Sequence, residues 1–171
     1  KNDAEKIFIP NYFCFGQQTE DHYKKIGAKV KNYYKCGSLR QHYADQENKP
    51  KQNEFKEFDI CLISENLPPD NDPVKKERLE SLEAIAQNVK NFTIEKRLKT
   101  ILVLKRDPST KRGKKEINFY QKIFGENSSI KISQNINENF KNYNIAYKSK
   151  LVIGSRSTLL LEALGYGSRI M

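Results

Sequence analysis

From Phe58 onward, the chain alternates short apolar runs with longer stretches of helical period. The apolar runs are bounded by Gly, Pro, Asp and Asn and predict strands at 58–64, 100–104, 129–133, 151–154 and 169–171. Strands that alternate with helices favour a parallel sheet covered by helices. We therefore predict an α/β fold with a Rossmann-like, doubly wound parallel sheet.

Four helices are expected between these strands. Asp72 and Pro73 predict the start of the first, which runs to about Arg97. Apolar residues at helical spacing mark the second and third helices, and Gly125 ends the second helix. These residues are Ile117, Tyr120 and Phe124 in the second helix, and Ile136, Phe140, Tyr143 and Tyr147 in the third. The fourth helix is predicted from Ser157 to Leu164.

The first 57 residues have a weaker pattern. They contain two predicted strands, at 6–10 and 33–36, and a short helix at 18–26 that Gly27 ends. The polar stretch from Arg40 to Lys56 has no periodicity, and we interpret it as a mobile connection or insertion. We therefore expect residues 1–57 to be an irregular connecting segment that packs on a domain formed by residues 58–171.

The charge of the chain limits its partners. Lys and Arg number 31 against 21 Asp and Glu, a formal net charge of +10 among 171 residues. This excess favours a polyanionic partner: a nucleic acid, a phosphorylated small molecule or an anionic membrane surface. No apolar run approaches the ~18 residues of a membrane-spanning helix. We expect a cytoplasmic protein that could contact the inner face of the membrane peripherally through its basic surface.

The cysteines and the chain ends give two further expectations. Cys14, Cys36 and Cys61 form no C-x-x-C pair, which disfavours a disulfide framework or a metal site. Cys36 and Cys61 lie in apolar runs, and we interpret them as small core residues. The only methionine is Met171, at the start of an apolar run. We therefore expect this sequence to be a piece of a longer protein.

The segment from Leu151 to Gly167 carries the clearest chemical signal. An aliphatic strand enters a turn, Gly154-Ser155-Arg156, which leads directly into a helix that begins with Ser157 and Thr158. In a parallel sheet, such a corner presents two hydroxyls and free backbone N–H groups at the carboxyl edge of the strands, where anions such as a diphosphate bind. Plain helix capping by Ser157 explains the local pattern equally well.

Three other positions bear on this corner. Glu162 lies about one and a half turns into the helix, within reach of a vicinal diol such as a ribose; a solvated surface glutamate is the alternative. Lys105 and Arg106 follow the second strand of the sheet and are placed to balance phosphate charge. We expect Lys105, Ser157, Thr158 and Glu162 to converge on one cleft.

Residues 105–115 are also the densest basic stretch of the chain, so we considered a nucleic-acid contact. No aromatic stacking motif accompanies this stretch, which disfavours that interpretation. Ser38, Ser64 and Glu65 follow predicted strands and are additional candidates, with turn formation or strand capping as the alternative. The chain has no G-x-G-x-x-G, P-loop or G-x-S-x-G motif.

Several segments together resemble the C-terminal, nucleotide-sugar-binding half of GT-B glycosyltransferases of bacterial surface or capsular carbohydrate biosynthesis. Leu151–Thr158 resembles the family's strand and Ser-Thr turn, and Leu161–Leu164 with Gly167–Ile170 resembles its Glu-Ala helix and the following strand. Phe58–Ser64 is similar to the first strand of that half. The segment that joins the two halves of these enzymes is similar to four parts of this chain: Phe15-Gly16, Tyr23, Gly27 and Tyr34–Ser38.

The resemblance implies a role for each matching residue. Ser157 and Thr158 would hold the donor phosphate, Glu162 would bind the ribose or another donor hydroxyl, and Lys105 would offset phosphate charge. Related enzymes often carry a histidine shortly after this lysine, where this chain has Arg106-Asp107-Pro108. The family takes its acceptor site, and usually its general base, from an N-terminal domain that this chain lacks, so the fragment alone should be inactive.

Our first hypothesis is therefore the donor-binding half of an inverting or retaining glycosyltransferase that takes a nucleotide-sugar as substrate and needs no bound cofactor or metal. The complete candidate phosphate-binding set is Lys105, Arg106, Ser155, Arg156, Ser157 and Thr158; no catalytic residue is assigned. A sugar-nucleotide epimerase or a polyol-phosphate transferase of the same fold is one alternative. The other is a non-catalytic basic module that binds a membrane or nucleic acid.

Overall fold

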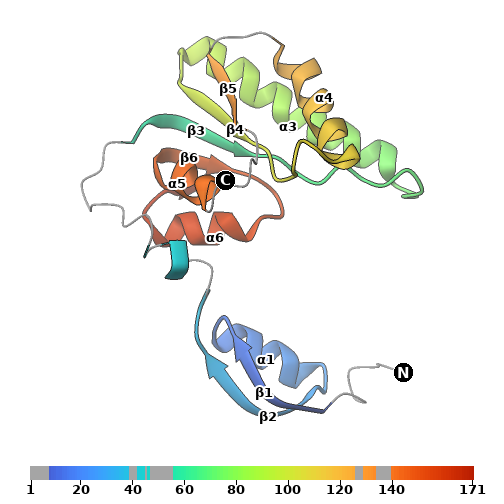
Figure 1. Ribbon diagram of the computed structural model, residues 1–171, viewed down its shortest axis with the longest axis vertical. Coiled ribbons are helices and arrows are strands. Elements are labelled where there is room, and N and C mark those ends of the chain that lie inside the picture. Colours follow the sequence, from blue (N-terminus) through green and yellow to red (C-terminus); the bar gives the residue numbers. More distant parts are fainter. Residues whose placement is uncertain (1–7, 39–41, 45, 47–55, 126–128, 134–139) are drawn as a thin grey trace. The chain divides into compact units, whose positions relative to one another are not determined.

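The computed structural model describes residues 8–38, 42–44, 46, 56–125, 129–133 and 140–171. The chain forms two compact units, Lys1–Glu47 and Asn48–Met171 (Figure 1). Their boundary therefore precedes the expected one after residue 57. Most of the polar stretch from Arg40 to Lys56 lies outside the described residues.

The first unit is more regular than the sequence predicted. Strand β1 (Phe8–Cys14), helix α1 (Gln17–Lys25) and strand β2 (Lys29–Lys35) form a βαβ arrangement with parallel strands. The rings of Tyr12 and Tyr23 lie 4.6 Å apart and pack α1 on the strands. Cys14 is buried here and Cys36 is exposed, so the prediction of a buried Cys36 was wrong. Cys36 lies one residue beyond the end of β2.

The second unit contains one five-stranded sheet in which every pairing is parallel. Its elements, in chain order, are β3 (Phe58–Ile63), α3 (Lys75–Lys96), β4 (Thr100–Val103), α4 (Lys111–Phe124), β5 (Ile130–Ser133), α5 (Lys141–Tyr147), β6 (Ser149–Ile153), α6 (Thr158–Gly165) and β7 (Arg169–Ile170). The spatial order is β5-β4-β3-β6-β7. This is the strand order of a doubly wound, Rossmann-like α/β fold, as predicted.

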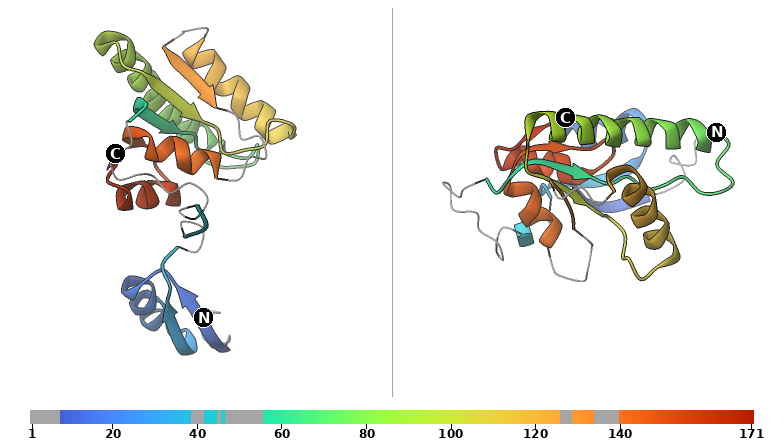
Figure 2. Two further views of the ribbon diagram at one scale, coloured as in Figure 1. Left: turned by 60° about the vertical axis from the view of Figure 1, so that its left-hand side comes forward. Right: turned by 90° about the horizontal axis from the view of Figure 1, so that it is seen from above.

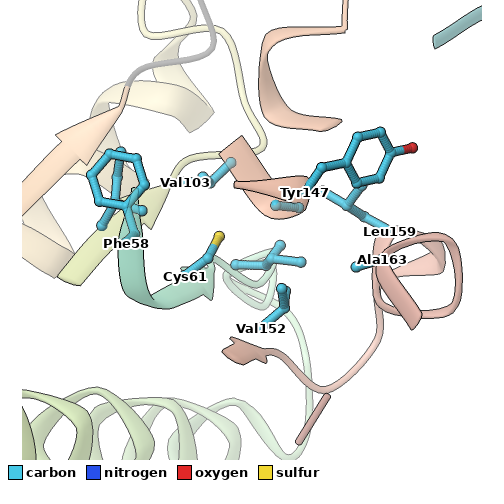
Figure 3. Close-up of a cluster of buried hydrophobic side chains, with 10 residues drawn as sticks. Phe58, Cys61, Val103, Tyr147, Val152, Leu159 and Ala163 are labelled. Carbon is cyan, nitrogen blue, oxygen red and sulfur yellow. The ribbon is translucent and has the colours of Figure 1, made fainter. Parts of the chain in front are cut away.

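Alternate residues of the strands bury against different helices. Ile60, Leu62 and Leu102 pack with residues of α3 and α4 on one face. Cys61 and Val152 pack with α5 and α6 on the other face (Figures 1 and 3). Both faces of the sheet are therefore covered by helices, which explains why the strands read as continuous apolar runs in the sequence.

Some helix boundaries differ from the prediction. Helix α3 begins at Lys75, because the Asp72 carboxylate accepts a hydrogen bond from Val74 N, which forms a turn before the helix. Helix α5 begins at Lys141, and the predicted position Ile136 lies outside the described residues. Gly125 ends α4 with a φ of 63°, a conformation that suits glycine. No helix in the described part of the chain is both long and apolar enough to cross a membrane.

The strand order also fixes where a ligand would bind. The chain passes from β3 to β4 and β5 in one direction, then returns to place β6 on the other side of β3 (Figure 2). The neighbouring strands β3 and β6 therefore form the topological switch point of the sheet. Beyond the carboxyl ends of such a strand pair lies the crevice in which doubly wound folds bind their ligands.

Candidate functional site

The Glu65 carboxylate lies at this switch point and joins three segments of the chain. Its Oε1 accepts hydrogen bonds from the backbone N–H groups of Ser155, at 3.0 Å, and Arg156, at 2.8 Å. Its Oε2 forms an ion pair with Lys105 Nζ at 3.2 Å. We call these four residues the carboxyl-edge cluster. They bring together the ends of β3, β4 and β6.

A polar network under the cluster fixes the positions of β3, β4 and α4 relative to one another. Ser64 Oγ donates a short hydrogen bond to Glu116 Oε1 of α4. Lys105 N donates to Ser64 Oγ at 2.9 Å and to Glu116 Oε1 at 3.2 Å. Glu65 N donates to the Tyr120 hydroxyl at 3.1 Å. Helix α4 thereby determines where the backbone of Glu65 and Lys105 lies.

Glu65 and Glu116 have opposite pKa shifts because their surroundings differ. Burial raises the pKa of Glu65, but hydrogen bonds from Arg156 N and Ser155 N and the charge of Lys105 outweigh burial and lower it below the usual value. Burial also raises the pKa of Glu116, and there the hydrogen bonds from Ser64 and Lys105 N do not offset it. Glu65 is therefore a stable anion at neutral pH.

The turn after β6 leads into α6 as the sequence predicted. Ser157 occupies the N-cap position, but its hydroxyl makes no capping hydrogen bond. Its carbonyl accepts the Leu160 N–H at 3.1 Å. Thr158 is exposed at the first position of the helix. The hydroxyl capping considered as an alternative is therefore not formed, and the two hydroxyls lie at the start of α6.

A groove of about 370 Å³ borders the carboxyl-edge cluster. Its lining includes Glu65, Asn66, Arg78, Ser155 and Arg156. Arg78 comes from α3, so the groove lies between the start of that helix and the turn after β6. We call it the edge groove.

The structure places the predicted residues in different surroundings. Lys105, Ser155 and Arg156 all contact Glu65, and Ser157 and Thr158 follow directly in the chain. Ser64 is buried in the network with Glu116. Ser38 belongs to the first unit.

Glu162 differs most from its expected position. It is only 5% exposed and lies in α6 with the buried residues Leu159 and Ala163. The alternative of a solvated surface glutamate is therefore wrong, because this side chain is on the inner face of the helix. The spacing from Leu159 to Glu162 and Ala163 is the i, i+3, i+4 pattern of a buried face, and this signal was present in the sequence.

Sequence reasoning missed Glu116, Tyr120 and Arg78. Glu116 precedes Tyr120 and Phe124 by one and two helical turns, on the apolar stripe of α4. A carboxylate in such a stripe indicates a buried polar contact, so Glu116 could have been found. The role of Arg78 depends on how closely α3 approaches the loop after β3. A local sequence pattern does not predict that approach.

Comparisons with known proteins add little to this geometry. No protein-family model matches the chain, and no curated protein matches it. Among solved structures, the chain is similar to a sucrose-phosphate synthase from Thermosynechococcus elongatus, with 12% sequence identity and a TM-score of 0.49. The match covers 94% of this chain and 39% of that protein. At this identity and TM-score, the match does not assign a function.

The carboxyl-edge cluster can hold an oxyanion. Two backbone N–H groups and an ammonium group already surround the carboxylate of Glu65, and the positive end of the α6 dipole lies next to them. Among the described residues, no group of three His, Cys, Asp or Glu side chains is arranged to hold a metal ion. The chemistry that these residues offer is therefore the binding of an anion by backbone and cationic donors.

Proposed function

We propose that the second unit binds the diphosphate of a nucleotide-sugar at the carboxyl edge of the sheet, as the donor-binding half of a glycosyltransferase. In full, the proposal is a GT-B-type enzyme of surface polysaccharide biosynthesis, as the sequence resemblance implies. The observation that carries the proposal is the position of the Glu65 carboxylate. It is held by Ser155 N, Arg156 N and Lys105 Nζ at the switch point of a doubly wound sheet.

In this proposal, the diphosphate binds at the N-terminus of α6. The hydroxyls of Ser157 and Thr158 and the first N–H groups of the helix donate hydrogen bonds to phosphate oxygens. Arg156 is exposed beside them and supplies a positive charge, while Lys105, in the segment after β4, supplies a second one. When the sugar leaves, negative charge builds up on the diphosphate, and these fixed donors stabilise it.

Glu65 then competes with the donor for the same groups. Its carboxylate and a phosphate are both anions, and both are attracted to Ser155 N, Arg156 N and Lys105. The donor therefore binds next to Glu65 at an electrostatic cost, or it displaces the carboxylate from the turn. Glu162 remains our candidate for the ribose, and this contact requires the sugar hydroxyls to reach the buried inner face of α6.

Calorimetric titration tests the proposal. The chain is titrated with UDP, CDP and GDP, and separately with a single-stranded oligonucleotide, at 50 and 200 mM salt. We expect one nucleotide to bind with modest salt dependence, because directional hydrogen bonds contribute as well as charge. A surface that merely neutralises many phosphates loses about 10³ to 10⁵ in affinity over this range.

Variants separate the proposal from its alternatives. Ser157→Ala should weaken nucleotide binding by about 1 kcal/mol, roughly fivefold, and leave oligonucleotide binding unchanged. Lys150→Gln is the matched control, because Lys150 pairs with Asp59 near the amino end of the sheet. Steeply salt-dependent oligonucleotide binding without nucleotide binding would favour the basic binding module. Nucleotide binding that Ser157→Ala leaves intact would place the ligand elsewhere.

A further inference from the structure

A second cavity, of about 450 Å³, lies beside the edge groove and is lined by an excess of cations. The loop after β3 forms one wall, and the start of α3, the segment after β4 and the start of α4 supply the cationic side chains. These side chains are Arg78, Arg106, Lys111, Arg112 and Lys115, with Asp70 as the one acidic residue of the lining. We call this the basic cavity. Its volume is within the usual range for small-molecule sites.

Internal ion pairs satisfy only part of this charge. Asp70 pairs with Lys115 at 3.1 Å and with Lys75 at 2.8 Å, and these two lysines lower its pKa to about 2. Arg78 pairs with Asp72 at 2.6 Å. Within the described part of the chain, no ion pair involves Arg106, Lys111 or Arg112. All three line the cavity, and Arg106 is also close enough to Glu116 for its charge to act on that buried carboxylate.

Helix stability does not explain the position of these cations. The first turn of α4 contains Lys111 and Arg112 and no acidic residue. Cations at a helix N-terminus oppose the helix dipole. Thr110 caps the same end by accepting the Gly113 N–H at 3.0 Å. An anionic ligand in the basic cavity would offset the repulsion by binding the side chains and the dipole at once.

A tight turn brings Arg106 to the cavity. Asp107 and Pro108 cross the start of α4 so closely that a Cβ on Gly113 would overlap the Asp107 carbonyl oxygen. Thr110 Oγ1 also donates to that carbonyl at 2.8 Å. The turn thereby fixes Arg106 on the same side as Lys111 and Arg112. The packed backbone of this turn therefore positions Arg106, while Lys111 and Arg112 are exposed at the start of α4.

The basic cavity and the edge groove are neighbouring but distinct. Asn66 and Arg78 line both of them. Ser155 and Arg156 line the edge groove, whereas Lys111, Arg112 and Lys115 line the basic cavity. Arg78 therefore lies at the boundary between the two.

We propose that the basic cavity binds a phosphate monoester that is separate from the donor diphosphate. A phosphate group carries up to two negative charges and matches the fork of an arginine guanidinium, and Arg106 and Arg112 line the cavity together with Lys111. The inference goes beyond the proposed function, and binding in the basic cavity does not depend on the donor diphosphate.

The test uses ¹⁵N-labelled protein of the full chain, titrated with glycerol 3-phosphate and, as an uncharged control, with glycerol. We expect glycerol 3-phosphate to shift the amide signals of Asn66, Asp70 and residues 111–115, and glycerol to shift none. Vesicles of phosphatidylcholine with and without phosphatidic acid form a second arm. Tighter binding to phosphatidic acid than to glycerol 3-phosphate identifies a lipid as the source of the phosphate, and the reverse identifies a soluble ester.

Matched variants decide the outcome. The double variant Lys111→Gln, Arg112→Gln should weaken the binding of glycerol 3-phosphate at least tenfold. Lys114→Gln should change it less than twofold, since Lys114 is exposed in the same helix turn but does not line the cavity. The proposal is overturned if binding does not saturate, if Lys114→Gln weakens it as much, or if the shifted amides are those of Ser155–Thr158.

UDP titrations of the same variants keep the two proposals distinguishable. If UDP does not bind and the glycerol 3-phosphate result holds, the donor site is wrong and the basic cavity stands as a phosphate site. If UDP binds and the double variant binds glycerol 3-phosphate as tightly as the unmodified chain, the proposed donor site stands and the proposed phosphate site in the basic cavity is wrong.

Discussion

The backbone N–H of Arg156 donates a hydrogen bond of 2.8 Å to the carboxylate of Glu65, although 91 positions separate the two residues. This bond links the end of β3 to the turn after β6 across the switch point of the sheet. It shows an oxyanion seated on backbone donors at the position where doubly wound folds bind their ligands. The predictions below follow from this arrangement and from the packing that supports it.

Removal of the Glu65 charge should strengthen nucleotide binding. In Glu65→Gln, the amide oxygen can still accept from Ser155 N and Arg156 N, but the negative charge that repels a phosphate is gone. We expect UDP to bind about three- to tenfold more tightly, measured by calorimetry. The control is Glu57→Gln, an exposed carboxylate near Lys99. Weaker UDP binding by Glu65→Gln would show that the carboxylate assists the ligand.

The pKa of Glu116 predicts a pH dependence of stability. Because burial raises this pKa, the folded protein holds the proton more tightly than the unfolded chain, whose glutamates titrate at about 4.3. The stability that this group contributes is complete below that value and is lost as the pH rises through the folded pKa. Urea unfolding at pH 5 and pH 8 measures how much stability is lost between these two pH values, and we expect a smaller loss for Glu116→Gln than for the unmodified chain. Equal losses of stability would contradict the raised pKa of Glu116.

Gly113 is expected to tolerate no side chain. A Cβ at this position would overlap the backbone of Asp107, which cannot move without displacing the turn that carries Arg106. Gly113→Ala should therefore lower the free energy of unfolding by about 1 to 3 kcal/mol, despite the better helix propensity of alanine. Lys114→Ala in the same turn should change it by less than about 0.5 kcal/mol. If the Gly113→Ala variant were more stable than the unmodified chain, the turn at Asp107 would have to be loosely packed.

The two faces of the sheet predict where core truncation is costly. Leu102 is fully buried between β4 and the α3–α4 layer, and Leu102→Ala should destabilise the second unit by about 2 to 5 kcal/mol. Leu161 is 69% exposed on α6, and Leu161→Ala should cost less than about 0.5 kcal/mol. Thermal unfolding of both variants measures the difference. Equal effects would contradict the assignment of the buried faces.

The central strands β3 and β4 could be predicted from the sequence because they are buried on both faces and are therefore continuous aliphatic runs. The other three strands are only partly buried or exposed, and their ranges followed from short apolar runs between turn residues and helices. The start of α3 could not be placed, because Asp72 forms a turn with Val74 where an N-cap was expected. Local pattern does not distinguish these two uses of an aspartate.

The site was only partly predictable for a related reason. Lys105 and Ser157 were predicted to emerge at one edge, and Lys105 does lie beside Glu65, which also contacts the two residues before Ser157. The edge groove is lined by none of Lys105, Ser157, Thr158 and Glu162, so their convergence on one cleft stays a prediction. The central role of Glu65 depends on the strand order, which brings β3 beside β6, and sequence periodicity does not reveal that order. The burial of Glu162 could have been predicted from its spacing to Leu159. The prediction of a ribose contact used only the chemistry of its carboxylate.

The most direct test of the central claim is a ¹⁵N NMR titration of the full chain with UDP, CDP and GDP. The account predicts that at least one nucleotide shifts the amide signals of Ser155, Arg156, Ser157 and Thr158 in a saturable way. It also predicts that Glu65, whose carboxylate accepts from this turn, shifts with them. If a nucleotide binds and these five signals remain in place while others move, the carboxyl edge of the sheet is not the donor site.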